Sequence, residues 1–466
     1  MRLTLLLAAI LIAGAGVFAQ TQFLAARGSS ASATSAVQHA AAARLDAPAI
    51  PLSPMAQLGR EIFFDPRLSE SGRMSCASCH DPGNAYAPAN SLATQLGGTK
   101  LRQQGIRATP TLTYLERTPR FMLRLDTAFD PDEARPAKAS RIAAIANANT
   151  RATDPLNALQ GQPVVPEGGM DWDGRAVVLA DQAEGPLLDP REMANKDRQK
   201  LLAKLAGAPY ANELVAVFGP AVFKSPATGL ADAYLALARF QMEDRSFHPY
   251  NSKFDFYLAG RVQLTAEEMH GLILFDDPHK GNCAACHLDK PNKNRLAPVF
   301  TDYEFEALAL PRNRQLTANR NAHFFDEGLC GPLRKDPGRD SDCGLFKTPT
   351  LRNVAIRHVF FHNGEVHSLE DAVRFYVERE TRPQRWYPRR ADGTLAIYDD
   401  LPAMHRANVD VKDAPFDRRR GEQPALNEQE IKDVVLFLKT LTDNYRPTSQ
   451  PTGQAASAAG PTASTR

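Results

Sequence analysis

Apolar residues recur at helical spacing in four segments of the chain, and alternating, strand-like patterns are few. Three of these segments begin with a helix-capping signal. Ser53 precedes a proline at the first helical position, and Thr265 and Asn427 are each followed by glutamate three residues on. The pattern predicts a mainly α-helical fold with long loops. The four segments are Pro54 to about Asp65, Leu230–Glu243, Ala266 to about Asp277, and Glu428–Asp443.

The first and third segments resemble each other. Aligning Gly59 with Gly271 also pairs Phe63 with Phe275, and an Asp-Pro step ends each helix. A Cys-x-x-Cys-His motif follows in both cases. Such paired likenesses predict an internal repeat, in which two related helix–loop units each carry one motif.

The repeated motif suits covalent attachment of a c-type haem, because two cysteines can bond the porphyrin vinyl groups and the histidine can ligate the iron. A Cys-x-x-Cys pair could instead be a zinc half-site or a thioredoxin-like redox pair. Zinc would need further close ligands, and a redox pair does not need the histidine. We therefore expect two covalently bound haem c groups, attached at Cys76, Cys79 and His80, and at Cys283, Cys286 and His287.

The N-terminus has the pattern of an exported protein. Met1-Arg2 is followed by an apolar run over 3–18, and Val17–Ala19 offers small residues for cleavage. The sequence predicts a signal peptide over 1–19 and a periplasmic mature protein. An uncleaved membrane anchor is the alternative. The net charge of +2 gives no reason to expect a nucleic acid partner.

At 466 residues the chain is long enough for two domains. We expect an N-terminal haem domain over 51–246 and a C-terminal haem domain over 247–445. Residues 20–50 read as a flexible tether, and 446–466 as a disordered tail. An irregular insertion over about 117–167 is either a lid over the first haem or a surface elaboration.

Two further cysteines, Cys330 and Cys343, lie close together among Gly, Pro and Asp residues. In an oxidising compartment they are expected to form a disulfide that closes this loop. Two unpaired thiols are the alternative.

Five short motifs occur in a fixed order together with the two haem motifs. With these motifs the chain resembles the bacterial dihaem cytochrome c peroxidases of the MauG superfamily over about Leu58 to Leu441, apart from the insertion. The motifs are DWDGRA at 171–176, QAEGP at 182–186, PREM at 190–193, FKTPTLRNV at 346–354 and FHNG at 361–364.

The resemblance implies roles around the first haem. His80 would be its proximal ligand, and Glu192 would be the distal acid–base that moves a proton during peroxide cleavage. Gln182 would position peroxide, and Trp172 would relay electrons between the haems. Taken alone, Glu192 could be a charge at a helix N-terminus after Pro190, Gln182 a surface residue, and Trp172 a core residue.

For the second haem, His287 would be the proximal ligand. The family's usual opposite ligand is a methionine fourteen residues after the histidine of the FHNG motif, but here that position is Tyr376. Tyrosine is the MauG-type choice, and a phenolate ligand lowers the reduction potential. The alternative is that Tyr376 only packs and that Met404 or His358 reaches the iron.

Two departures from the family pattern bear on the site. Many relatives block the first haem with a histidine soon after the first motif, but 81–116 contains none, which indicates an open site. The resemblance also implies a calcium ion between the haems. Ala108 stands where relatives have asparagine, and the other ligands would be backbone carbonyls near Arg357 and Val359, so the sequence leaves calcium open.

The resemblance implies a periplasmic peroxidase that reduces hydrogen peroxide with electrons from a small c-type cytochrome or similar donor. A MauG-like enzyme that oxidises tryptophans of a partner protein is the alternative, although Gly281 and Asn282 stand where that enzyme has a surface tryptophan. A dihaem electron carrier is a third hypothesis, and Glu192 with Gln182 argues against it. Relatives are often dimers, which implies a homodimer.

Overall fold

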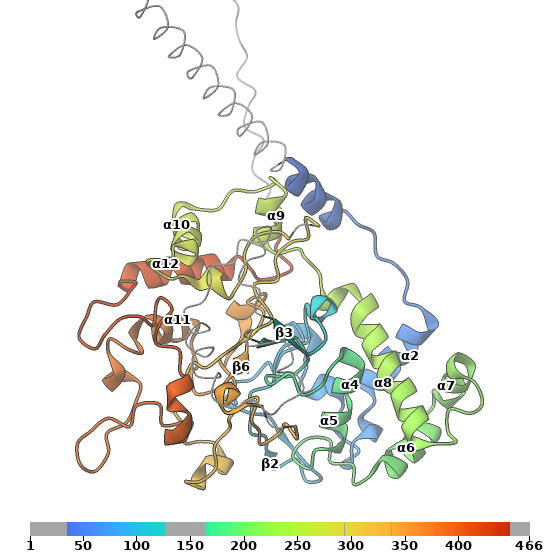
Figure 1. Ribbon diagram of the computed structural model, residues 1–466. Coiled ribbons are helices and arrows are strands. Elements are labelled where there is room, and N and C mark those ends of the chain that lie inside the picture. The colour runs from blue at the N-terminus through green and yellow to red at the C-terminus, as the bar shows by residue number, and fades with distance from the viewer. Residues whose placement is uncertain (1–34, 126–163, 293, 337, 448–466) are drawn as a thin grey trace, which may run out of the picture.

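The computed structural model describes residues 35–125, 164–292, 294–336 and 338–447. This part of the chain is mainly helical, as predicted, and its six short strands form three two-stranded sheets. Figure 1 shows two groups of helices. One half of the molecule contains α2 and α4 to α8, and the other half contains α10, α11 and α12. The helices are α2 (Pro54–Phe64), α4 (Leu179–Gln182), α5 (Glu184–Leu188), α6 (Arg198–Ala206), α7 (Ala211–Phe218), α8 (Pro226–Glu243), α9 (Lys253–Leu258), α10 (Ala266–Asp276), α11 (Leu369–Glu378) and α12 (Glu428–Lys439). The strands are β1 (Leu96–Gly97), β2 (Gln103–Gln104), β3 (Met122–Leu125), β4 (Val164–Glu167), β5 (Phe305–Glu306) and β6 (Phe346–Lys347).

The predicted helix caps are present. The Ser53 side chain accepts a hydrogen bond from the Ala56 amide at the start of α2, and Thr265 and Asn427 form capping boxes at α10 and α12. These side chains satisfy amide donors that the first helical turn leaves free. The last helix is shorter than expected, because α12 ends at Lys439 rather than near Asp443.

In the N-terminal half, α2 packs closely against α8. Gly59 makes this contact possible, because a Cβ at this position would lie 1.9 Å from the Ala236 carbonyl oxygen. One turn along, the Phe63 and Phe240 rings meet edge to face with centroids 5.6 Å apart. The absence of a side chain at Gly59 therefore sets the distance between the two helices.

In the C-terminal half, α10 packs against α12 in the same manner. A Cβ at Gly271 would lie 2.0 Å from the Asp433 carbonyl oxygen, and the Phe275 and Phe437 ring centroids are 5.2 Å apart. Each half thus contains one close helix pair with a glycine at the crossing and an aromatic pair beside it.

We expect Gly271→Ala to lower the free energy of unfolding by at least about 2 kcal/mol, since the new methyl group would overlap backbone atoms that cannot move without separating the helices. Chemical denaturation followed by circular dichroism measures the change. Gly185→Ala in α5 is the matched control, because a Cβ there meets nothing within 4 Å. Equal stability of the two variants would contradict this account of the crossing.

Two large hydrophobic clusters form the core. The first draws its buried residues from Leu58 to Phe247 and includes α2, α6 and α8. The second draws its buried residues from Phe254 to Leu441 and includes α10, α11 and α12. The cysteines of the first motif pack against the first cluster, and Cys283 packs against the second.

The tether expected over 20–50 is wrong for its second part. Residues 35–45 form a helix, the dark blue element of Figure 1, whose four consecutive alanines at 40–43 favour that conformation. Arg245 holds this segment by donating to the Arg44 carbonyl at 2.8 Å, and Asp46 pairs with Arg261. Residues 1–34, with the expected signal peptide, lie outside the described residues, as do 448–466 of the expected tail.

The two ends of the predicted insertion pair with each other. Strands β3 and β4 run antiparallel, with Met122 opposite Glu167, so the chain leaves and returns at neighbouring positions. Arg124 adds ion pairs to Glu167 at 2.6 Å and to Glu304 at 2.7 Å. Residues 126–163 lie outside the described part of the chain, so both the lid and the surface elaboration stay predictions.

The predicted disulfide is confirmed, since Cys330 and Cys343 are bonded to each other. Of the helices in the described ranges, none combines the length and the apolar character needed to cross a membrane.

Candidate active site

The first Cys-x-x-Cys-His motif forms a single tight turn at the edge of a cavity. Residues Cys76–Ser78 form a 3₁₀ turn, and the His80 amide donates to the Cys76 carbonyl at 2.9 Å. The two cysteines and the histidine all line this cavity of about 140 Å³, which we call the first cavity. Burial raises the pKa of the Cys76 thiol to about 12.

His80 is held in the form that a metal ligand requires. Its Nδ1 lies 3.1 Å from the Tyr86 carbonyl oxygen, to which it can donate. Burial lowers the pKa of His80 to about 4, so the ring is neutral at physiological pH. A neutral ring that donates through Nδ1 carries a lone pair on Nε2, which is the atom that would ligate iron.

The second motif repeats this arrangement beside a larger cavity of about 270 Å³, which we call the second cavity. Residues Cys283–Ala285 form the 3₁₀ turn, and the His287 amide donates to the Cys283 carbonyl at 2.8 Å. The Nδ1 atom of His287 lies 2.9 Å from the Phe300 carbonyl oxygen. Both histidines are therefore oriented by a backbone acceptor.

Glu192 lines the first cavity together with His80. It does not lie at a helix N-terminus, because Pro190 belongs to a turn that follows α5, in which the Glu192 amide donates to Asp189. The Gly98 amide next to β1 donates to the Glu192 carbonyl at 2.7 Å and fixes this turn. Burial, reinforced by Asp189 and Asp171, raises the pKa of Glu192 to about 7.

Gln182 and Asp171 lie in the wall that separates the two cavities, and both residues line each cavity. The Gln182 amide donates to the Asp171 carboxylate at 3.3 Å. Arg175 lies 3.3 Å from the same carboxylate and lines the first cavity. Gln182 is therefore not a surface residue, and Arg175 adds a cation that the sequence did not predict at this site.

Trp172 also lines both cavities. Its indole N–H donates to the Ala108 carbonyl oxygen at 2.7 Å, and the Ala108 amide donates to the His362 carbonyl oxygen at 2.7 Å. The ring is therefore held by a hydrogen bond in the wall between the two cavities, and it is not enclosed in one of the two hydrophobic clusters.

Tyr376, on α11, lines the second cavity with Cys286 and His287. Burial raises the pKa of Tyr376 above its ordinary value, so the phenol keeps its proton unless a cation binds the oxygen. The alternative ligands are placed elsewhere. Met404 is 78% exposed, His358 is exposed, and neither lines the cavity.

His362, which the sequence did not predict as a cavity residue, also lines the second cavity. Its ring stacks on Phe346 with centroids 3.5 Å apart, and its Nε2 is buried without a hydrogen-bond partner, 3.9 Å from Asp400. Burial lowers the pKa of His362 to about 3. The FHNG motif could have identified it as a cavity residue, but not its stacking on Phe346.

Two half-buried cations that line the second cavity test whether it fits haem. Arg357 donates to the carbonyls of Thr109 at 3.0 Å and Val359 at 3.4 Å, and burial lowers its pKa to about 10. Burial also lowers the pKa of Lys347 to about 8. No carboxylate of the described residues forms an ion pair with Arg357. A buried cation without a counter-ion favours an anionic ligand, and the porphyrin propionates would supply one.

The calcium position that the sequence leaves open receives no support. The Val359 carbonyl accepts from the Arg357 guanidinium, and the Ala108 carbonyl accepts from Trp172. Oxygen atoms that accept from these donors are not free to surround a calcium ion.

Comparison with known proteins agrees with the geometry. A family model described as di-haem cytochrome c peroxidase matches residues 53–263. The methylamine utilization protein MauG of Paracoccus denitrificans is 32% identical over 402 residues, covering 84% of this chain and 90% of that protein. A cytochrome c551 peroxidase of Nitrosomonas europaea is 29% identical, covering 70% of this chain and 75% of the relative. The crystal structure of the diheme peroxidase BthA from Burkholderia thailandensis has a TM-score of 0.70 and 36% identity, covering 86% of this chain and 89% of that one.

Proposed function

This chain belongs to the di-haem cytochrome c peroxidase family that includes MauG, and from that premise we propose that it is a periplasmic peroxidase that reduces hydrogen peroxide to water. The observation that carries the proposal is the half-buried Glu192, with a pKa of about 7, in the same cavity as Cys76, Cys79 and His80. The electrons would come from a small c-type cytochrome or a similar donor.

Haem would supply the redox chemistry with peroxide, and the protein would hold one haem at each cavity. Cys76 and Cys79 would bond the first porphyrin, with His80 as its proximal ligand. The second porphyrin would be bonded at Cys283 and Cys286, with His287 as proximal ligand. This assignment is supported by the two matching turns and by the two Nδ1 contacts that orient each ring.

The proposed role of Glu192 is to move one proton twice. Hydrogen peroxide, two electrons and two protons give two molecules of water. With a pKa near 7, the carboxylate can accept a proton from the near oxygen of peroxide and donate it to the departing oxygen. Gln182, which the Asp171 carboxylate orients, would hold peroxide or water beside it.

The second cavity would hold the haem that stores electrons, with His287 and Tyr376 as the residues that would bind its iron. Tyr376 supports this because it lines the cavity with His287, whereas Met404 and His358 do not. A phenolate ligand would keep the reduction potential of this site low. Arg357 would pair with a porphyrin propionate.

Trp172 would relay electrons between the two cavities. We expect Trp172→Phe to slow steady turnover with reduced cytochrome c by at least about tenfold, because an indole in the shared wall is lost and nothing replaces it as a redox-active ring. The steady-state rate measures the effect. Trp386→Phe is the matched control, since Trp386, the other of the two tryptophans in the sequence, lines neither cavity. Equal rates for the two variants would remove Trp172 from the relay.

A MauG-like activity, in which the enzyme oxidises tryptophans of a partner protein, is the second candidate. It is favoured by Tyr376 and by the lack of histidine over 81–116. Against it, Gly281 and Asn282 precede Cys283 instead of a surface tryptophan. An electron carrier without catalysis would not need Glu192 and Gln182 in one cavity.

Stopped-flow addition of hydrogen peroxide to the haem-loaded protein, with and without reduced cytochrome c, distinguishes these functions. Steady oxidation of cytochrome c supports the peroxidase. A long-lived oxidised state that cytochrome c does not discharge supports the MauG-like enzyme. Spectra that do not respond to peroxide would leave only the electron carrier.

We also infer that the chain comprises two haem domains, over about 51–246 and 247–445, that arose from an internal repeat. The two separate hydrophobic clusters support the division, and the two glycine-centred helix pairs support the repeat. A periplasmic location follows from the apolar run over 3–18, and a homodimer from the resemblance to dimeric relatives.

A further inference from the structure

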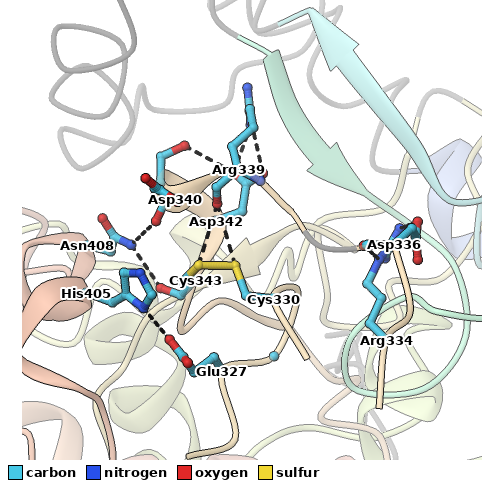
Figure 2. The surroundings of a disulfide bond; sticks show 12 residues. Glu327, Cys330, Arg334, Asp336, Arg339, Asp340, Asp342, Cys343, His405 and Asn408 are labelled. Atoms are coloured by element: carbon cyan, nitrogen blue, oxygen red, sulfur yellow. Dashed lines mark hydrogen bonds and ion pairs between the residues drawn. A yellow bond between two sulfur atoms is a disulfide. The ribbon is translucent and has the colours of Figure 1, made fainter. Parts of the chain in front are cut away.

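The disulfide-bonded loop lies against two side chains that neither cavity uses. Cys343 follows the 3₁₀ turn Asp340–Asp342, and His405 belongs to the 3₁₀ helix Ala403–Asn408. Figure 2 shows the His405 ring beside the disulfide, with its Nδ1 in contact with the Glu327 carboxylate. Ligand atoms of Glu327, Cys343 and His405 all lie within 4.8 Å of one another.

Hydrogen bonds to backbone carbonyls hold this cluster together independently of the disulfide. The Glu327 carbonyl accepts from the amides of Cys330 at 3.1 Å and Gly344 at 2.9 Å. The Asn408 side chain, at the end of the helix that carries His405, donates to the Cys343 carbonyl at 3.0 Å. The two sulfur atoms would therefore stay close to His405 if the bond between them were reduced.

The cluster is incomplete as it stands. The His405 side chain is 13% exposed, yet its Nε2 is buried and has no hydrogen-bond partner. Buried polar atoms are nearly always satisfied, so an unsatisfied one calls for an explanation. Neither His405 nor Glu327 lines the first or second cavity, so a role in the proposed peroxidase reaction does not explain the unsatisfied Nε2 atom.

We propose that Cys330, Cys343, His405 and Glu327 form a binding site for a zinc-type divalent cation that becomes available when the disulfide is reduced. A dithiol reductant would break the sulfur–sulfur bond, giving two thiols while the reductant becomes a disulfide. Binding of Zn²⁺ would then release two protons from the thiols. Two thiolates, one imidazole and one carboxylate are a ligand set that tetrahedral zinc accepts.

The geometry is close to what zinc needs. Ligand atoms of a tetrahedral zinc site lie about 3.3 to 3.8 Å apart. Glu327, Cys343 and His405 would therefore approach one another by about 1 Å. The two sulfur atoms, 2.07 Å apart in the disulfide, would separate by about 1.7 Å. His405 would bind as the neutral ring through Nε2, the nitrogen without a hydrogen-bond partner, with its proton on Nδ1 against the Glu327 carboxylate. In the oxidised protein only two donors remain, and we expect no stable binding.

The test uses the haem-loaded full chain with Zn²⁺ alone as the probe. One sample is reduced with dithiothreitol under anaerobic conditions, and a second keeps its disulfide; both are freed of reductant by gel filtration. Each is then equilibrated with one equivalent of Zn²⁺, filtered again and analysed by elemental mass spectrometry. We expect one zinc per chain in the reduced sample and none in the oxidised one. The haem absorption spectrum and circular dichroism verify that the reduced chain stays folded.

Variants identify the ligands. The double variant Cys330→Ser/Cys343→Ser should retain no zinc in either state, and His405→Ala should weaken binding by the reduced chain at least about tenfold. Asp336→Asn is the matched control, because Asp336 is 75% exposed on the same loop and pairs with Arg334, away from the cluster (Figure 2). Zinc retention that is the same in both redox states, in the double variant or in His405→Ala would overturn the proposal.

Discussion

Replacing Glu192 by glutamine is expected to slow the reaction of the enzyme with hydrogen peroxide by about 10²- to 10⁴-fold, the usual contribution of a positioned acid–base. Glutamine has nearly the same shape but cannot accept a proton at neutral pH. Glu192 lies in the first cavity with His80, so the loss should fall on the peroxide step and leave binding of the porphyrins unchanged. Stopped-flow absorption after mixing with peroxide measures the rate.

The pH dependence follows from the raised pKa of Glu192. The carboxylate form accepts the proton, and its fraction grows as the pH rises through about 7. The wild-type rate should therefore rise through pH 7 and level off above it, and this limb should vanish in Glu192→Gln. Because burial disfavours the ionised carboxylate, its penalty on folding begins above the ordinary pKa of 4.5 and is complete above 7. The variant should accordingly gain stability relative to wild type at high pH.

Glu184→Gln is the matched control for this experiment. Glu184 lies eight residues earlier on α5, pairs with Arg198 and lines neither cavity. Its variant should react at the wild-type rate. If Glu192→Gln reacted equally fast, or kept the limb near pH 7, the acid–base role of Glu192 would be refuted.

Tyr376→Phe is expected to change the absorption and electron paramagnetic resonance spectra of the second haem and to raise its reduction potential by on the order of 0.1 V or more. The physical reason is that an anionic phenolate stabilises the oxidised iron, and phenylalanine offers no ligand atom. Spectroelectrochemical titration measures the potential.

Tyr398→Phe separates ligation from the general loss of a phenol. Tyr398 donates to Glu380 at 2.7 Å and does not line the second cavity, so its removal should leave the potential where it is. An unchanged spectrum in Tyr376→Phe would exclude tyrosine as the ligand and would direct attention to His362, a histidine that lines that cavity.

Much of the fold could be predicted because its signals are local. The caps at Ser53, Thr265 and Asn427 depend on side chains three residues or fewer from the amides they satisfy, so the printed sequence contains both partners. Each haem motif is local too, because its two cysteines and its histidine lie within five consecutive residues. The disulfide was predictable because its loop is short and rich in turn-forming residues.

Other features depend on partners that are far apart in the sequence. Gly59 and Gly271 could be aligned, but their reason for being glycine is a carbonyl on a helix more than 160 residues away. The position of Arg357 in the cavity wall, with no ion pair to a carboxylate of the described residues, likewise emerges only when the chain is folded. The helix over 35–45 is not predictable in this way, because its alanines give no amphipathic period and Arg245, which stabilises it, lies 201 residues away from Arg44.

The hydrogen bond from Trp172 to the Ala108 carbonyl bears on the proposed relay of electrons through the wall between the cavities. An amide oxygen is far too weak a base to take the indole hydrogen, so an oxidised ring would keep it and carry a positive charge. The relay would then be electron transfer alone, without a coupled proton transfer.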